Sequence, residues 1–472
     1  MTTASSTTSS TNSLLQQAAQ SILSGATKST LDVNSLVSAL VTAKTAGQAA
    51  AISTAQSTDN TTLSALGSMK SSLSALQTAL AGLSDGTAFT TLGATMSGTG
   101  VTATTTTGAV AGSYSVNVQK IATANQISSG AYASGATLGT GTVTVGVGSS
   151  TMSITLDSTN NTLSGLASAI NSASTNPGVT ASVVTASDGQ HLVLTSTKTG
   201  AANTVTISGG AGVDAGLQTA SFTQVTAAQD AQLTISGSTV TSATNTVTGA
   251  LSGVTLTLTS AAVGTTQTLS VATDNSSIEK TITSFVSAYN SWISTEKSLS
   301  SYDSSSSSAG PLLGDAMLNS AVNGIASIVS GGVTSSGTTY SLAQIGLDLQ
   351  DDGTIKLNTT TLESALSTSP GSVQALFNGT NGIGQQLNSF INSYSESTTG
   401  QIDQRTATIN SDLTSLTDQQ TALTDYQNTL TAQYNAQFTA LNTLMTQMAN
   451  NTSYLNQLFG GNGSSGTLNK SS

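Results

Sequence analysis

The feature that most constrains this chain is a heptad pattern of apolar residues over its last long stretch, residues 401–459. Counted from Ile402 in alternating steps of four and three, 12 of the 17 seam positions are apolar. A repeat of 3.5 residues indicates a helix that packs against a partner along one seam. The apolar positions are Ile402, Ile409, Leu413, Leu416, Leu423, Leu430, Tyr434, Leu441, Leu444, Met448, Leu455 and Leu458.

This helix is expected to be stable only when a second surface covers its seam. Fully burying the twelve side chains would contribute roughly 20 to 35 kcal/mol, whereas an isolated helix buries almost none of them. The stretch also contains twelve threonines, which disfavour a helix relative to alanine, and only five charged residues. We therefore expect a helix that orders on contact with a partner. An ordinary intramolecular helical hairpin is the alternative that periodicity leaves open.

A matching seam lies near the other end of the chain, in residues 46–83. Its apolar residues also alternate in steps of three and four, at Leu63, Leu66, Met69, Leu73, Leu76, Leu80 and Leu83. Two short amphipathic helices are predicted before it, one ending at Gly25 and one over about residues 29–44, with Leu36, Val37, Leu40 and Val41 on its apolar face. Asp32 and Asn34 are candidate N-caps of the second helix.

Between residues 89 and 274 the apolar period changes from 3.6 to 2, which is typical of β-strands. Nine strands are predicted there, with β-branched residues and Gly-rich turns, and Asp188-Gly189 is a hairpin signal. One helix, starting near Asn161 or Thr162, interrupts them. A Gly/Ala-rich stretch at 209–220 suggests that one β domain is nested inside another.

These patterns predict an α+β fold, with a helical coiled-coil stem from both chain ends and nested antiparallel β domains inserted in the middle. The expected segments are an N-terminal segment, partly disordered (1–45), a helical leg in two parts (46–91 and 275–400), an inner β domain in two parts (92–130 and 222–274), an outer β domain (131–221), and a C-terminal coiled-coil helix with a disordered tail (401–472).

Composition excludes several classes of partner. With 10 Lys plus Arg against 21 Asp plus Glu, the net charge is -11, so no basic patch for nucleic acid or an anionic membrane is expected. The absence of cysteine excludes disulfides and thiolate metal sites. The first 25 residues do not resemble a secretory signal, and no apolar stretch reaches the 18 residues of a membrane span. Export, if it occurs, would then need a route independent of a signal peptide.

No catalytic, cofactor or metal site is predicted. The single histidine, His191, lies in a strand beside a hairpin turn and is interpreted as structural. Residues 348–359 resemble a calcium loop only at Asp352 and Gly353, because Gln350 and Thr359 occupy ligand positions. Met445, Met448, Tyr426, Tyr434 and Phe438 are interpreted as packing residues. The 21 acidic residues leave a catalytic carboxylate pair open, since nothing singles one out.

Five strings, in order, resemble the flagellar filament cap family, also called the hook-associated protein 2 family. They are LDVNSLVSALV, AQDAQLTISGSTVTSATNTVTGALSGVTLTLTS, SFVSAYNSW, GPLLGD and LAQIGLDLQDDGTIKLNTTTLESALSTSPGSVQALF. The motif residues to which the resemblance gives a structural role are Asp32, Gly237, Asn245, Gly253, Phe285, Tyr289, Asn290, Gly346 and Gly353. The chain departs from the family at Thr30, where a glycine is usual, and in having about thirty residues before Asp32.

The resemblance implies a secreted, homo-oligomeric ring, pentamer-like, at the distal tip of the bacterial flagellar filament, with residues 1–45 as an export and polymerisation segment. Such a cap retains exported flagellin and promotes its folding and insertion. Implied partners are other copies of the chain, flagellin, hook-filament junction proteins and a cytoplasmic export chaperone at the C-terminal helix. The candidate interface residues are the seam positions Leu36, Leu40, Leu66, Leu73, Leu80, Leu413, Leu416, Leu423, Leu430, Tyr434, Leu441, Leu444, Met448 and Leu455.

Two other functions remain as alternatives. The outer β domain could make the protein a surface adhesin, in which case deleting residues 131–221 would abolish cell binding but leave filament growth intact. The helical ends and β middle also suit a flagellin-like filament subunit. An enzyme is the least favoured class, because no site for chemistry is apparent.

Overall fold

The computed structural model describes residues 33–305, 308–335 and 337–459. These residues form two compact units. The helical unit comprises residues 33–84, 283–361 and 375–459, and the β unit comprises Asp85–Ile282 and Leu362–Gln374. The helical unit therefore joins the two ends of the chain, and the sheets lie in the middle of the sequence. The short helix predicted at residues 14–25, the candidate cap Asp32 and the predicted tail at 460–472 lie outside the described residues.

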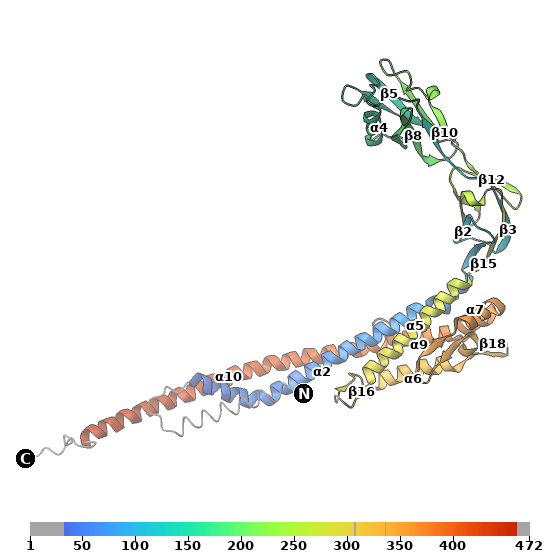
Figure 1. Cartoon of the computed structure of the whole chain (residues 1–472). Helices are drawn as coiled ribbons and strands as arrows, with labels where there is room; N and C mark the ends of the chain where they lie inside the picture. The colour runs from blue at the N-terminus through green and yellow to red at the C-terminus, as the bar shows by residue number, and fades with distance from the viewer. Residues whose placement is uncertain (1–32, 306–307, 336, 460–472) are drawn as a thin grey trace, which may run out of the picture. The chain divides into compact units, whose positions relative to one another are not determined.

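Three long helices are α2 (Val33–Ser84), α5 (Asn275–Ser300) and α10 (Gln401–Phe459). Within the helical unit, α2 and α10 lie side by side (Figure 1). The shorter elements of the second half of the chain are α6 (Ala316–Gly331), η3 (Leu342–Ile345), α7 (Thr359–Thr368), α8 (Pro370–Asn378) and α9 (Ile383–Ser395), and the paired strands β16 (Tyr302–Asp303) with β17 (Ser308–Ala309), β18 (Val333–Ser335) with β19 (Thr338–Tyr340), and β20 (Leu347–Leu349) with β21 (Ile355–Leu357).

The core of the helical unit contains the largest fully buried side chains of the protein. Phe285, Tyr289 and Trp292 follow one another on a single face of α5 and are at most 1% exposed. Phe377 of α8 meets Phe285 edge to face, with ring centroids 5.8 Å apart. Aromatic pairs favour this geometry. One face of α5 therefore contributes the large side chains of this core.

The first long helix differs from its prediction, because α2 is one continuous helix of 52 residues rather than a short helix followed by a longer one. The predicted break fell at Lys44 to Ala46, beside Gly47. Alanines flank this point on both sides and favour the helix, while Thr45 is buried against a neighbouring helix. One glycine costs only about 1 kcal/mol in a helix, so packing outweighs it.

The inner β domain consists of two antiparallel sheets with an apolar core between them. The larger has the order β1-β15-β3-β11-β12 and the smaller the order β13-β14-β2. Alternate residues of both sheets, such as Val116, Leu233 and Leu256, are buried in a single core. The strands are β1 (Leu92–Met96), β2 (Val101–Thr105), β3 (Gly112–Lys120), β11 (Ala231–Ile235), β12 (Ser238–Ser242), β13 (Thr246–Leu251), β14 (Val254–Leu258) and β15 (Thr266–Thr273). A short helix α3 (Thr87–Thr90) precedes them, and η2 (Ser260–Ala262) follows β14.

The outer β domain is nested between β3 and β11 in the sequence and has its own core. Its sheets have the orders β10-β4-β8-β7 and β6-β5-β9. Its elements are β4 (Ala124–Ser128), β5 (Gly141–Val147), β6 (Ser150–Leu156), α4 (Leu163–Ser172), β7 (Val179–Ala186), β8 (Gly189–Thr199), β9 (Val205–Gly209), η1 (Thr219–Ser221) and β10 (Thr223–Thr226). The Asp188-Gly189 hairpin joins β7 and β8, with Ala186 paired to Gly189.

The structure confirms the α+β class, with a two-ended helical stem and nested antiparallel sheets in the middle. It differs in where the sheets divide, because β4 and β10 hydrogen-bond into the outer domain, whereas the sequence placed residues 124–128 and 223–226 in the inner one. Short strands take their sheet from distant partners, and sequence spacing does not reveal those partners. The edge strands β1 and β2, which pair with the distant β15 and β14, were not predicted for the same reason. The edge strands β12 and β13 were not predicted either, although each pairs with its neighbour in the sequence.

Candidate assembly interface

The first half of α10 is packed inside the helical unit through its predicted seam. Ile402, Ile409, Leu423 and Leu430 are at most 8% exposed. Leu413 and Leu416, on the same seam, are half-buried. The seam therefore has an intramolecular partner over this half of the helix, and that partner is mainly α2, with α9 beside the start of α10.

On α2, the residues of the predicted apolar face that meet α10 are the valines, each one position after a leucine chosen as an interface residue. Val37 and Val41 form a buried cluster with Leu430, and Val33, Tyr434 and Phe438 pack against it. Leu36 and Leu40, the predicted seam positions, are only half-buried. The valines recur every four residues and continue through the buried Thr45, so this stripe faces α10. Farther along α2, the predicted positions Leu66, Leu73 and Leu80 are at most 1% exposed.

Two polar contacts fix the antiparallel register of α2 and α10. Thr45, 2% exposed, accepts a hydrogen bond of 2.7 Å from Gln427 Nε2. Lys70 pairs with Asp403 at the start of α10. That hydrogen bond from Lys70, with another from the Thr398 backbone, lowers the pKa of Asp403. Between the two contacts, each step towards the N-terminus on α2 is matched by one step towards the C-terminus on α10.

The second half of α10 carries the same apolar seam but has no apolar cover among the described residues. The exposed fractions rise from 48% at Leu441 to 64% at Tyr454. We call this surface the apolar ridge, and it consists of Leu441, Leu444, Met445, Met448, Tyr454 and Leu455. Four of these residues were predicted as seam positions. Met445 and Met448, and Tyr426 in the first half of the helix, were interpreted as packing residues, but among the described residues all three are exposed.

The threonines of α10 are compatible with a helix because their hydroxyl groups bond back to the helix itself. Eleven of them donate to the carbonyl oxygen four residues earlier, at 2.7 to 3.1 Å. These bonds satisfy the side chains without a partner but contribute little to helix stability. The helix therefore still depends on packing of its seam.

The motif glycines lie where the backbone turns. Gly237 (φ 84°) follows Ser236 (φ 48°) in the two-residue turn between β11 and β12, and positive φ at both positions is the requirement of a type I′ hairpin. Gly253 (φ 65°) lies between β13 and β14, where a Cβ atom would come 2.1 Å from the backbone nitrogen of Ala109. Gly346 and Gly353 also have positive φ, at the end of η3 and in the β20–β21 hairpin.

Each of two motif asparagines hydrogen-bonds with its side chain to both the backbone N–H and the backbone carbonyl of one residue, as a neighbouring strand would. Asn245 accepts from the Ala122 N–H at 2.7 Å and donates to its carbonyl at 2.9 Å. Asn290 on α5 does the same to Ile355 of β21, at 2.8 and 2.9 Å. Phe285 and Tyr289, from the same motif as Asn290, are buried in the core, where burial raises the pKa of Tyr289 to about 12. All these motif residues make structural contacts in this chain, and Asp32 lies outside the described residues.

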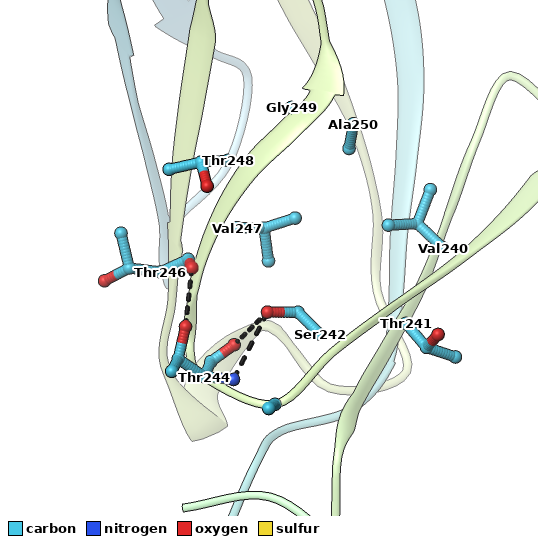
Figure 2. Close-up of a pocket in the computed structure, with 10 residues that line it drawn as sticks. Val240, Thr241, Ser242, Thr244, Thr246, Val247, Thr248, Gly249 and Ala250 are labelled. Atoms are coloured by element: carbon cyan, nitrogen blue, oxygen red, sulfur yellow. Dashed lines mark hydrogen bonds between the residues drawn. The ribbon is translucent and has the colours of Figure 1, made fainter.

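A shallow hollow of about 370 Å³ lies between the ends of β12 and β13. Its walls are hydroxyl and aliphatic groups, and Figure 2 shows Ser242, Thr244 and Thr246 bonded to one another along the turn. None of its lining residues can ionise; they are residues 240–244 and 246–250. The hollow therefore offers neither a charged ligand group nor a general acid or base.

The described residues contain no group of three or more His, Asp or Glu side chains arranged to hold a metal ion. Within residues 33–305, 308–335 and 337–459, no helix is both long and apolar enough to cross a membrane. Asp352 is one of the two residues at which the sequence resembles a calcium loop. In the structure, its carboxylate accepts hydrogen bonds from Thr354 and pairs with Lys297 at 3.6 Å. Asp352 therefore closes a hairpin.

Sequence reasoning missed the polar contacts of the stem. Lys70 lies within an apolar pattern and was given no role. Gln427 is one of the five positions of the α10 seam that are not apolar, and it was given no partner. Arg405 bonds Asp315, the N-cap of α6, at 2.5 Å, which ties α10 to that helix. The few charges in the stem were the available signal, because a charge in a charge-poor helix has few possible partners. Thr45 is uncharged, so the sequence carried no such signal for its contact with Gln427.

Three models of known protein families match different parts of this chain. Models of the flagellar hook-associated protein 2 N-terminus and C-terminus match residues 29–125 and 228–450, respectively. A model of the flagellin hook IN motif matches residues 142–198, within the outer β domain. These matches together include both parts of the stem and both β domains.

Individual relatives extend over most of the chain. Flagellar hook-associated protein 2 of Escherichia coli (strain K12) is 34% identical over 465 residues, which covers 92% of this chain and 97% of the relative. B-type flagellar hook-associated protein 2 of Pseudomonas aeruginosa is 30% identical over 443 residues, covering 88% and 93%. The crystal structure of the flagellar cap protein FliD D1-D2-D3 domains from Escherichia coli matches with a TM-score of 0.52 and 33% identity, covering 73% of this chain and 99% of that one.

Proposed function

This chain belongs to the flagellar hook-associated protein 2 family, and on that premise we propose how it acts as the cap at the distal tip of the bacterial flagellar filament. Copies of the chain assemble into a ring at the filament tip, where they retain exported flagellin and promote its folding and insertion. The observation that carries this proposal is the apolar ridge on α10, which the other described residues of the chain leave uncovered.

The ridge is a surface that assembly would bury. Its six side chains are 48% to 64% exposed. Burying what remains exposed would contribute roughly 5 to 10 kcal/mol per subunit at the usual value for apolar side chains. That free energy is comparable to the stability of a whole domain. It therefore favours a stem that is complete only in the assembled cap.

The stems of neighbouring subunits provide the cover of the ridge.

A stem that becomes ordered only on contact with its partners also suits export. A subunit that leaves the cell through the flagellar type III apparatus must unfold readily, and a helix that depends on partners does so. A cytoplasmic chaperone that covers the ridge before export would prevent premature association. The hook-filament junction proteins are the first surface on which the exported subunits would assemble. The family comparisons favour this role over an adhesin or a flagellin-like subunit.

The proposal is tested by complementing a knockout strain with variants of the ridge. Leu444→Ser combined with Met448→Ser and Leu455→Ser should abolish filaments and release flagellin monomer into the medium. The matched control changes three exposed polar residues of the same helix half, Asn442→Ser, Thr446→Ser and Asn450→Ser. We expect normal filaments from the control strain.

Secretion of the ridge variant must be measured in the same strains. A secreted ridge variant that supports normal filaments would refute the assembly role of the ridge. Absence of a filament defect in the knockout itself would refute the cap function. The two failures are therefore distinguishable.

A further inference from the structure

The only histidine of the chain lies beside the turn of the β7–β8 hairpin. His191 is the third residue of β8 and pairs with Val184 of β7. Its side chain is 19% exposed. It lies against the short segment of residues 129–132, which leaves β4 and runs beside the start of β8.

Two oxygen atoms flank the imidazole ring, and both can only accept hydrogen bonds. Nδ1 lies 2.9 Å from the carbonyl oxygen of Ser129, and Nε2 lies 3.1 Å from Oδ1 of Asp188. A neutral imidazole has one N–H group, so either tautomer would point a lone pair at an acceptor. Only the doubly protonated ring donates to both oxygen atoms. The geometry therefore favours the imidazolium form.

The contacts around His191 join the hairpin to segment 129–132. The Ser129 N–H donates to the Leu192 carbonyl at 2.9 Å, and the Leu192 N–H donates to Ser129 Oγ at 2.8 Å. Tyr132 and Gln190 exchange backbone bonds of 2.9 and 2.8 Å. Loss of the imidazole contact with the Ser129 carbonyl would therefore weaken one edge of this pairing.

We propose that His191 is a pH-sensitive clasp of the outer β domain, which fastens segment 129–132 to the β7–β8 hairpin when the ring is doubly protonated. This inference is independent of the cap function. Asp188, on the hairpin itself, is the charged group that faces the ring. Segment 129–132 contributes one ionisable side chain, Tyr132, whose hydroxyl donates to Asp214 at 2.8 Å. Strand β7 contributes none.

The direction of the pH response follows from the contacts. The Ser129 carbonyl and then the Asp188 carboxylate raise the pKa of His191, and the bond from His191 lowers the pKa of Asp188. A histidine whose pKa is higher in the folded state contributes its full stabilisation below its unfolded pKa. That stabilisation is lost as the pH rises through the folded pKa. The clasp therefore closes in mild acid and opens towards alkaline pH.

The test is an NMR titration of the full chain carrying 13C-labelled histidine, where a single Cε1 resonance is expected. Its midpoint should lie above the ordinary value of about 6.5, and Asp188→Asn should lower it. Asp157→Asn, in a turn of the same domain that bonds Thr159 instead, is the control and should leave it unchanged. A midpoint at or below the ordinary value, or one unaffected by Asp188→Asn, would overturn the proposal.

A second measurement separates a clasp from a merely structural histidine. Amide hydrogen exchange at Tyr132 and Gln190 should be several-fold faster in His191→Gln than in the wild-type protein below the midpoint, and equal in the two proteins above it. A difference that does not change across the midpoint contradicts a pH-dependent clasp.

Discussion

Replacing one leucine of the α10 seam in its covered half, and one in its exposed half, tests whether burial or sequence pattern determines stability. Leu430 and Leu444 are 14 residues apart and occupy the same heptad position. Leu430 is 5% exposed and packs on Val37 and Val41, whereas Leu444 is 53% exposed. The two substitutions to alanine are therefore chemically identical and differ only in cover.

We expect Leu430→Ala to destabilise the α2–α10 pairing by about 2 to 3 kcal/mol, the lower part of the range for a buried leucine, since a two-helix contact can partly close over the gap. Leu444→Ala should change the stability of the monomer by less than about 0.5 kcal/mol. The measurement is amide hydrogen exchange over residues 33–45, detected by mass spectrometry. At about 1.36 kcal/mol per tenfold change, Leu430→Ala should accelerate exchange there roughly 30- to 150-fold.

Two results would contradict the effect of cover on these two leucines. If both variants exchange residues 33–45 at the wild-type rate, the cluster of Leu430 with the valines contributes nothing to the pairing of the helices. If both accelerate exchange equally, the exposed ridge is already covered in the monomer. Either outcome would refute the division of the seam into a covered and an uncovered half.

Two other substitutions test the motif residues. Asn290→Ala removes both bonds to the Ile355 backbone and should destabilise the helical unit by about 2 to 4 kcal/mol, measured by urea unfolding with the single tryptophan as the fluorescent probe; an unchanged midpoint would contradict the strand-like role of this side chain. Gly253→Ala should destabilise the inner β domain far more than Gly264→Ala in thermal unfolding followed by circular dichroism. Both glycines have positive φ, at a cost of about 1 to 2 kcal/mol for alanine, but only at Gly253 does a Cβ atom meet the backbone of Ala109. Equal losses would mean that the close approach is unimportant.

Regular patterns made most of the secondary structure predictable. Strands β7 and β15 lie in the stretch where alternating apolar residues predict strands. Helix α4 begins after Thr162, whose hydroxyl accepts from Gly165, and this residue was a predicted start. In each case a strong local signal agrees with the tertiary structure. Where the signal was weak, as in the edge strands β1 and β2, pairing with strands far away in the sequence decided the outcome.

The candidate interface was less predictable than the elements that form it. The heptad pattern identified Leu430 and Leu444 alike, because a repeat records which face of a helix is apolar and not what covers it. The hydrogen bond of Thr45 with Gln427 was missed because it joins residues 382 positions apart. The ring environment of His191 was missed because one of its partners is a backbone carbonyl, which every residue possesses.

The sequence by itself determined that both ends of this chain are helices with apolar seams and that the middle is β, since periodicity follows from backbone geometry alone. Only the tertiary structure decided that α2 runs unbroken past Gly47 and that, on its predicted apolar face, the valines rather than the leucines meet α10. Only the structure, too, showed that among the described residues the cover of the α10 seam ends beyond Phe438. The physical reason is that burial depends on which surfaces meet in space, and a seam has the same pattern whether or not its partner is present.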